Sequence, residues 1–366
     1  MKNKLKNIIV TVSFAALIFG LSVSFLLKPP AEFSDSERRA LLQFPTLSVN
    51  SVLSGKFMSD FESYTLDQFP LRDGFRTVKA LVSKHIFNQQ DNNGIYVHDG
   101  YAAAMEYPLN SDSITNAANK FNFIKQKYLN ETNSIYLSLI PDKNFFLAKE
   151  SGRLSLDYEK LVKQLCEEMQ DEKYIDIFPL LSIDDYYKTD THWKQENIDD
   201  VAEKLLDEME TQADFSSLTE NTLDVPFYGV YYGQSALPLD AEEIKYFTSD
   251  MIDSFEVYDH QNGNPMKVYD MEKAQGKDPY EMFLSGSLSL ITINNPKALN
   301  DKNLVVFRDS FGSSIAPLLA TGYSKVTVVD IRYIQSSVLD RFVDFENSDV
   351  LFLYSTLVLN NSETLK

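Results

Sequence analysis

The sequence predicts an α/β protein whose main domain is built on a mostly parallel sheet. Two observations predict this fold class. From residue 94 onward, apolar runs of strand length alternate with stretches of helical length, which is typical of parallel sheets with helices on both faces. The apolar run at 304–307 stops at Asp309-Ser310 and continues into a helical stretch. In open α/β sheets, sites gather at the carboxyl ends of strands, so Ser310 is expected at such a site.

The N-terminal segment 1–28 predicts a membrane anchor. Lys2, Lys4 and Lys6 precede an uncharged stretch at 8–27. As a helix at ~1.5 Å per residue, this stretch would reach about 30 Å, the thickness of a bilayer core. Positive residues stay cytoplasmic, so the rest of the chain is expected outside the cell, on a single-pass anchor in the cell membrane. A cleaved signal peptide is the alternative, in which Ser22-Val23-Ser24 would supply the cleavage site and the protein would be secreted.

Residues 29–90 predict a helical stalk that packs on the main domain. Ser34 and Glu37 stand at capping-box spacing, which predicts the start of a helix. Two further helices are expected at 57–66 and 74–85, and Pro70 interrupts the helical pattern between them.

Residues 91–366 predict the α/β domain. The expected elements are a hairpin at 95–105, helices at 113–128, 156–169 and 194–209, and strands at 134–140, 174–178, 304–307, 325–330 and 350–354. Residues 213–300 alternate poorly, and we expect them to form an inserted excursion that carries hairpins between the two halves of the domain.

Composition excludes several classes of function. The net charge of −19 argues against a nucleic-acid partner, because phosphate backbones are bound by clustered Lys and Arg, and it suits a solvated extracellular domain. The single cysteine, Cys166, cannot form an internal disulfide and is expected to pack in the core. Four scattered histidines and one cysteine offer no zinc-ligand spacing, so neither a metal nor a cofactor is expected.

Two separated segments carry the residues of a nucleophilic site. Asp190 and His192 share a face if their segment is extended, so the carboxylate would orient the imidazole. If His192 Nε2 reaches Ser310, it acts as general base towards the hydroxyl, while Asp190 stabilises the imidazolium. The backbone N–H groups of Ser310 and Phe311 would help to hold an oxyanion. Each piece also has a plainer interpretation, with Asp190 and His192 as a surface pair and Asp309-Ser310 as a helix cap.

Short motifs along the chain resemble a known family. The segments 189–193, Thr-Asp-Thr-His-Trp, and 308–311, Arg-Asp-Ser-Phe, resemble the SGNH-like acetyltransferase group that includes the periplasmic alginate O-acetyltransferases. The fuller resemblance is to the DHHW proteins of Gram-positive bacteria, and it spans nearly the whole exported chain. It rests on the motifs at 67–73, 141–143, 227–229, 308–311 and 329–333. It implies an SGNH-hydrolase-like three-layer sandwich.

The resemblance implies a catalytic triad of Ser310, His192 and Asp190. Thr191 stands where the second residue of the DHHW motif is usually histidine. Alginate acetyltransferase relatives also carry Asp-Thr-His-Trp, so this departure leaves the triad chemistry intact.

Further site residues are expected near the oxyanion. Ser287 follows a glycine where the DHHW pattern has Gly-Asn, and Arg308 replaces the glycine of the usual Gly-Asp-Ser block. If that asparagine donates to the oxyanion, the shorter serine alters the hole. The candidate oxyanion or substrate-binding residues are Phe311, Ser287, Arg332 and Tyr333. Arg332 and Tyr333 are equally plausible as structural anchors.

Three functions remain from different classes. The first is an anchored extracellular O-acetyltransferase that loads acetyl on Ser310 and passes it to a secreted or cell-wall polysaccharide. By resemblance, a membrane-bound O-acyltransferase would supply the acetyl group, because one apolar span cannot export it. The second is a carbohydrate acetylesterase with the same triad, which only the exclusion of water separates from a transferase. The third is a catalytically silent polysaccharide-binding or assembly protein.

Overall fold

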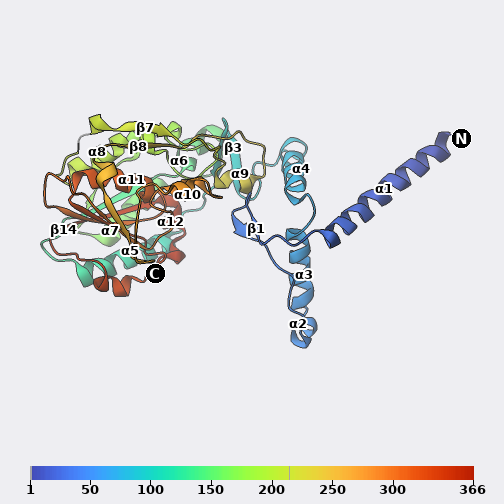
Figure 1. Cartoon of the computed structure of the whole chain (residues 1–366), viewed down its shortest axis with the longest axis horizontal. Helices are drawn as coiled ribbons and strands as arrows, with labels where there is room; N and C mark the ends of the chain where they lie inside the picture. The colour runs from blue at the N-terminus through green and yellow to red at the C-terminus, as the bar shows by residue number, and fades with distance from the viewer. Residues whose placement is uncertain (1, 214) are drawn as a thin grey trace. The chain divides into compact units, whose positions relative to one another are not determined.

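The computed structural model describes residues 2–213 and 215–366, and it divides into two compact units (Figure 1). Unit 1 holds the chain up to Asn93 together with Tyr232–Pro238, and unit 2 holds Gly94–Tyr231 and Leu239–Lys366. Met1 of the predicted anchor and Asp214 of the predicted excursion lie outside the described residues.

Unit 1 is mainly helical. Its elements are α1 (Lys2–Leu27), β1 (Phe33–Ser34), β2 (Arg39–Ala40), α2 (Val49–Leu53), α3 (Lys56–Asp67) and α4 (Arg72–His85). One helical segment of the described residues, Lys4–Leu27, is long and apolar enough to cross a membrane, and none of it is buried within the structure. A helix of this length at an N-terminus serves either as an anchor or as a signal sequence.

The helix predicted from Ser34 is wrong. Ser34 and Arg39 pair instead in the short antiparallel ladder of β1 and β2. The Ser34 hydroxyl accepts from the Glu37 N–H at 3.2 Å, which is half of a capping box. The other half does not form, because the Glu37 carboxylate pairs with the guanidinium groups of Arg72 and Arg76 on α4. Long-range ion pairs therefore override the local helix signal.

Unit 2 is built on one eight-stranded sheet. Its strand order is β10-β9-β11-β13-β12-β14-β5-β6, and the pairs from β13 to β6 are all parallel, whereas β11, β9 and β10 join antiparallel at one side. The strands are β5 (Ile135–Ile140), β6 (Lys173–Tyr174), β9 (Glu256–Asp259), β10 (Asn264–Met266), β11 (Leu290–Asn294), β12 (Asn303–Arg308), β13 (Lys325–Val329) and β14 (Ser348–Ser355). Two separate two-stranded antiparallel sheets complete the strands of unit 2: β3 (Ile95–His98) with β4 (Tyr101–Ala104), and β7 (Thr219–Thr222) with β8 (Lys245–Thr248).

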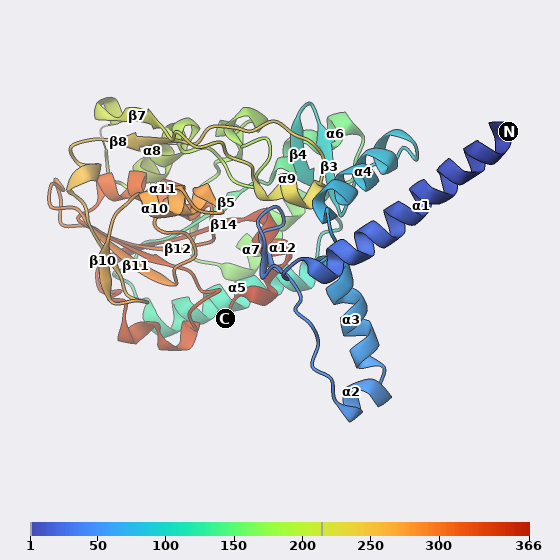
Figure 2. The same ribbon diagram turned by 45° about the vertical axis from the view of Figure 1, so that its right-hand side comes forward.

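Helices cover both faces of this sheet, as Figure 2 shows for α8 and α11 on one side and α5 on the other. The helices of unit 2 are α5 (Ser111–Tyr128), α6 (Lys143–Ser151), α7 (Tyr158–Met169), α8 (Asp199–Glu208), α10 (Met271–Ala274), α11 (Gly312–Leu319) and α12 (Thr356–Asn360). The short α9 (Val230–Ser235) runs across the boundary of the two units. Along β12, Leu304 and Val306 pack with α8 and α11, whereas Val305 and Phe307 pack with α5 and α7. The two-residue period of a strand thus divides the core into two layers, one on each side of the sheet.

Several predicted boundaries differ from those observed. The strand expected at 174–178 ends at Tyr174, because the Asp176 carboxylate accepts from the Phe178 N–H at 3.1 Å and turns the chain into a 3₁₀ segment. The helix expected from 194 begins as a 3₁₀ turn, and α8 starts at Asp199. Within residues 213–300, β9, β10 and β11 extend the main sheet.

Candidate active site

The turn after β12 presents the Ser310 hydroxyl at the carboxyl end of a central strand. Asp309 shapes this turn: its Oδ1 accepts from the Phe311 N–H at 3.0 Å, and its Oδ2 accepts from the Ser355 N–H at the end of β14 at 2.7 Å. Asp309 is fully buried, so both hydrogen bonds are shielded from water. Gly312 opens α11 at a point where a Cβ atom would lie 2.6 Å from the Arg308 Cβ. Only glycine fits there, and it lets the helix begin directly after the serine.

The histidine comes from a bend held on both sides by the backbone. Tyr186 and Trp193 form an antiparallel bridge, and the Tyr187 N–H donates to the His192 carbonyl at 3.1 Å. Trp193 is fully buried, and its indole N–H lies 3.1 Å from the Phe311 carbonyl and 2.9 Å from the Ser314 hydroxyl. The side chain next to the histidine is thus fastened to the segment that carries the serine.

Ser310, His192 and Asp190 form one hydrogen-bonded chain. His192 Nε2 lies 2.8 Å from Ser310 Oγ, and His192 Nδ1 lies 2.6 Å from Asp190 Oδ1. A neutral imidazole that donates from Nδ1 to the carboxylate accepts the Ser310 hydroxyl at Nε2, and we assign this tautomer from the hydrogen bonds. Asp190 is fully buried and His192 is 9% exposed, so both side chains are largely shielded from solvent. This is the order of donor and acceptor that nucleophilic serine chemistry requires.

The carboxylate of Asp190 is itself held by the backbone. Its Oδ2 accepts from the Val230 N–H at 2.8 Å, and its Oδ1 also accepts from the His192 N–H at 3.1 Å. Gly229, just before Val230, lies so close that a Cβ atom there would stand 2.3 Å from the Asp190 Cα. The Gly229 N–H donates to the Thr189 hydroxyl at 2.9 Å. Glycine at 229 is therefore required for the close approach that fixes Asp190.

An aromatic ring covers the imidazole. The Tyr280 ring stacks on His192 with centroids 3.9 Å apart and planes 7° apart, and its hydroxyl donates to Ser314 Oγ at 3.0 Å. Burial raises the pKa of Tyr280 well above its ordinary value, so the phenol stays neutral. A stacked neutral ring restricts the rotation of His192 and keeps Nε2 directed at the serine.

The groups that could donate a hydrogen bond to an oxyanion differ in the hydrogen bonds that they already make. The Ser310 N–H makes no hydrogen bond within the described parts of the chain, whereas the Phe311 N–H is donated to Asp309. Ser287 is exposed and follows three consecutive residues with positive φ, at 51°, 54° and 77° for Leu284, Ser285 and Gly286. Phe311 would have to give up its bond to Asp309 before its N–H could serve an oxyanion.

Arg308 and Arg332 share one carboxylate. Arg332 binds Asp330 through Nε at 2.9 Å and Nη2 at 2.7 Å, and the fully buried Arg308 reaches the same carboxylate at 3.4 Å. Arg308 Nη2 also donates to the Gly286 carbonyl at 3.3 Å, so it joins the loop before Ser287 to the turn that carries Ser310. Burial lowers the pKa of the Arg308 guanidinium.

The segment after β13 leaves the sheet beside the segment after β12. Phe307 pairs with Val329 in parallel register. The chain that follows β13 therefore leaves the sheet at the carboxyl ends of the strands, as Ser310 does. Tyr333 is 47% exposed, with the Arg332 guanidinium 5.4 Å from its ring centroid. Arg332 is anchored by Asp330, and Tyr333 presents the more accessible surface.

Sequence reasoning missed three residues that support the triad. Tyr280 and Gly229 contact the triad from the region between α8 and β11. Glu242 accepts from the N–H groups of Lys188 and Thr189 at 2.7 and 2.8 Å, which holds the start of the histidine loop. The motif at 227–229 was the one available signal for this region, since it placed a glycine after two aromatic residues.

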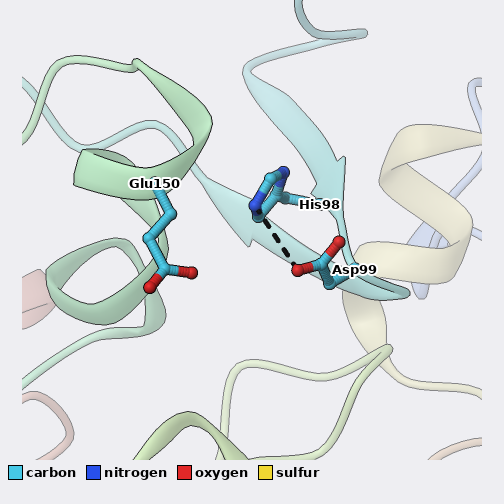
Figure 3. Close-up of side chains that lie close together, drawn as sticks. All are labelled: His98, Asp99 and Glu150. Atoms are coloured by element: carbon cyan, nitrogen blue, oxygen red, sulfur yellow. Dashed lines mark ion pairs between the residues drawn. The ribbon is translucent and has the colours of Figure 1, made fainter.

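A further group of possible metal ligands lies away from the triad. His98, Asp99 and Glu150 bring one ligand atom each to within 4.8 Å of one another, and His98 Nε2 lies 3.6 Å from Asp99 Oδ2 (Figure 3). Both carboxylates are exposed. Exposed acidic groups of this kind are common without a metal ion, so the group is not assigned as a site.

Comparisons with known proteins identify the fold. No family model and no curated protein matches the chain. A DHHW family protein from Eubacterium siraeum superposes with a TM-score of 0.60 at 18% identity, over 75% of this chain and 95% of that one. This chain has the fold of a DHHW protein.

Two other solved structures are similar. Bacillus cereus PatB1, in a structure with a sulfonyl adduct, matches with a TM-score of 0.58 at 18% identity, over 72% of this chain and 97% of that one. The O-acetyltransferase domain of Pseudomonas putida AlgJ matches at 12% identity with a TM-score of 0.44, over 73% of this chain and 92% of that one. The predicted α/β fold of the DHHW type, with a mostly parallel sheet, is confirmed.

Proposed function

We propose that this protein is an extracellular O-acetyltransferase that acts on a secreted or cell-wall polysaccharide through a covalent intermediate on Ser310. The observation that carries the proposal is the chain from Ser310 Oγ through His192 to Asp190, with distances of 2.8 and 2.6 Å. Acyl transfer is supported further by the DHHW-type fold, and O-acetyl chemistry by the motifs at 189–193 and 308–311. The triad chemistry needs no metal and no cofactor.

In the first half-reaction, Ser310 Oγ attacks the carbonyl carbon of an acetyl donor while its proton passes to His192 Nε2. Asp190 stabilises the resulting imidazolium through Nδ1. The free N–H of Ser310 donates to the oxyanion. When the tetrahedral intermediate collapses, the bond to the leaving group breaks, and His192 returns the proton to that group.

In the second half-reaction, a sugar hydroxyl loses its proton to His192 and attacks the acetyl-serine ester. A new ester forms on the sugar, the bond to Ser310 Oγ breaks, and the proton goes back to the serine. Arg332 and Tyr333 follow β13 at the carboxyl end of the strands, where Ser310 also lies, and they would contact the acceptor sugar. Ser287 would line the oxyanion side through the loop that Arg308 holds. If water takes the place of the sugar, the same steps give a carbohydrate acetylesterase.

The proposal includes a membrane anchor and a separate protein that supplies the acetyl group. The helix at Lys4–Leu27 would anchor the protein in the cell membrane with unit 2 outside. An anchored protein with one such helix among its described residues does not carry acetyl groups across the bilayer. A membrane-bound O-acyltransferase would therefore deliver the acetyl group to Ser310.

Labelling and product analysis test this function together. The purified chain is treated with a serine-directed fluorophosphonate, and a second sample receives an acetyl donor with oligosaccharide acceptors. We expect labelling and acetylated oligosaccharides with the wild type and with Ser337→Ala, an exposed serine of unit 2, but neither with Ser310→Ala. Release of acetate without acetylated sugar would establish the esterase. Equal labelling of Ser310→Ala and wild type would show that Ser310 is not the nucleophile, and the proposed enzymatic function would be contradicted.

A further inference from the structure

The apolar surface of the protein is concentrated in unit 1. Among the described residues, 14 exposed large hydrophobic side chains fall within residues 28–93, against 11 in the much longer unit 2. Monomeric soluble proteins rarely expose contiguous apolar patches of large size, and such patches mark surfaces that contact a membrane or another protein. The segment that follows α1 therefore carries a surface to be covered.

Helix α4 shows the pattern most clearly. Leu71 at its N-cap and Phe75, Val78, Val82 and Ile86 follow one another at spacings of three or four, so they line one face of the helix. Leu71 is 75% exposed and Ile86 is 71% exposed. Phe75 meets the Phe69 ring edge-on at 5.6 Å and Val82 is half-buried, whereas Leu71, Val78 and Ile86 are exposed. Most of this apolar stripe is therefore open to solvent.

The opposite face of α4 is fastened to its own unit. Arg72 and Arg76 pair with the Glu37 carboxylate, and Arg76 donates to the Gly233 carbonyl at 2.8 Å. Ala80 and Ser83 are buried on that side. The contacts that hold α4 within unit 1 are therefore made by the face opposite the apolar stripe. The stripe itself is not needed for these contacts.

Contacts with α1 indicate the depth at which this surface lies. The Phe25 ring lies 5.9 Å from the Tyr64 ring of α3, and Ile18 and Leu21 line an apolar groove together with Leu66. In a helix that spans the membrane up to Leu27, Ile18 stands about 14 Å inside that end, at ~1.5 Å per residue. This depth lies within the hydrocarbon core of a bilayer about 30 Å thick. In that arrangement, the C-terminal end of α3 would lie beside lipid.

The charge of this segment also suits a membrane surface. Residues 28–93 contain eight Lys or Arg and eight Asp or Glu, whereas the whole chain has a net charge of −19. Anionic lipid headgroups repel excess carboxylate, so a neutral apolar segment meets the bilayer at lower electrostatic cost than the acidic remainder of the chain.

We propose that the C-terminal end of α3 enters the acyl region of the bilayer that α1 spans and that α4 lies along the surface of this bilayer, with the stripe of Leu71, Phe75, Val78, Val82 and Ile86 against lipid. This inference rests on the anchor in the proposed function. Helices of this kind bind a membrane through buried apolar area, and α4 has the required apolar face. The lipids of the outer leaflet cover the apolar stripe, and no second protein is needed to cover it.

Site-specific fluorescence tests the proposal on the full chain. Cys166 is replaced by Ser, and single cysteines are placed at Ile86 on the stripe, at Lys84 on the exposed polar side, and at Ile9 in α1. Each variant carries an environment-sensitive dye and is reconstituted alone into vesicles of phosphatidylcholine and phosphatidylglycerol. Lipids with a quencher on the acyl chain are then added to the mixture.

We expect the dyes at residues 9 and 86 to lose most of their fluorescence to the lipid quencher, and the dye at residue 84 to keep it. If residue 9 is quenched while residue 86 behaves like residue 84, the lipid contact of α4 is overturned and the anchor stands. If residue 9 is also unquenched, the anchor fails and the inference fails with it. Protection of residue 86 from lipid and aqueous quenchers alike, with disulfide cross-linking at that position, would assign the stripe to a second copy of the chain.

Discussion

At the residue scale, the candidate site depends on a few buried groups whose hydrogen bonds are complete. Asp190 accepts from His192 and from the Val230 backbone, so its charge is oriented before any substrate binds. Removal of such a charge does more than delete one hydrogen bond, because the imidazole then loses the partner that selects its tautomer.

Asp190→Asn tests that role. The amide keeps the size of the carboxylate but can donate to Nδ1, which would favour the tautomer with a proton on Nε2. We expect kcat for acetyl transfer to fall by about 10³- to 10⁴-fold with little change in stability. Steady-state rates and thermal unfolding of the purified variant give both quantities, with Asp199→Asn, an exposed residue of α8, as the control. A loss below tenfold would mean that Asp190 does not orient the base.

Lys143 provides a second prediction at this scale. Its Nζ is buried and donates to the carbonyls of Tyr187 at 2.8 Å and Lys188 at 3.1 Å, directly before the loop of Asp190 and His192. Burial lowers the pKa of Lys143 to about 7. Between this value and the ordinary value of 10.5, the unfolded chain binds more protons than the folded chain, so this residue makes stability increase with pH across that window.

Chemical denaturation from pH 7 to 10 measures this effect. We expect the difference in the free energy of unfolding between wild type and Lys143→Met to change in favour of wild type as the pH rises. Lys149→Met, an exposed residue of α6, should track wild type. A constant difference between wild type and Lys143→Met would show that Lys143 carries the same charge in both states.

At the element scale, the site is assembled from strand ends and close backbone approaches, and sequence patterns reach only part of this. The apolar run before Ser310 and the helical stretch after it predicted β12 and α11, because strand and helix periods are local properties. Ser34 and Glu37 gave an equally clear local signal that failed, since Glu37 pairs with two arginines of α4.

The contacts that support Asp190 and His192 could not be predicted from local sequence patterns. Tyr280 is 88 positions from His192, and nothing in its own neighbourhood marks it as a ring that stacks on an imidazole. Gly229 stood in a recognisable motif, but its reason is the nearness of Asp190, which only the folded chain shows. Contacts between distant segments depend on the topology of the sheet, and residue spacing does not encode that topology.

Gly229→Ala tests the close approach. A methyl group would lie 2.3 Å from the Asp190 Cα, so the backbone at one of the two residues must move. We expect a large loss of activity and a loss of stability of about 1–3 kcal/mol. Gly74→Ala in α4, where a Cβ meets nothing within 4 Å, should instead be neutral or stabilising. Full activity of Gly229→Ala would show that Asp190 is not held by this contact.

At the scale of the whole molecule, an acidic α/β unit follows a unit that starts with one long apolar helix and in which residues 28–93 balance eight basic against eight acidic side chains. The net charge of −19 keeps the larger unit solvated. We therefore infer that unit 2 carries out the chemistry and that unit 1 places the protein at the membrane.

Ala16→Arg tests the placement. An arginine near the middle of the span costs about 2.5–3.5 kcal/mol on insertion scales, so we expect much of the protein to be released by alkaline extraction of membranes. Leu27→Arg, at the end of the same helix, should remain in the membrane fraction, because a long basic side chain there reaches the headgroups. Equal retention of the two variants, or release of the wild type, would contradict an anchoring role for α1.

The most direct measurement of the central claim is the mass of the acetylated chain. The protein is mixed with an activated acetyl ester, stopped with acid within the first turnover, and digested for mass spectrometry. We expect one added acetyl group on the peptide that contains Ser310 in wild type, and none on that peptide in His192→Ala at the same time point. Acetyl on Ser310 at the same rate without His192, or no acetyl on Ser310 in the wild type, would contradict it.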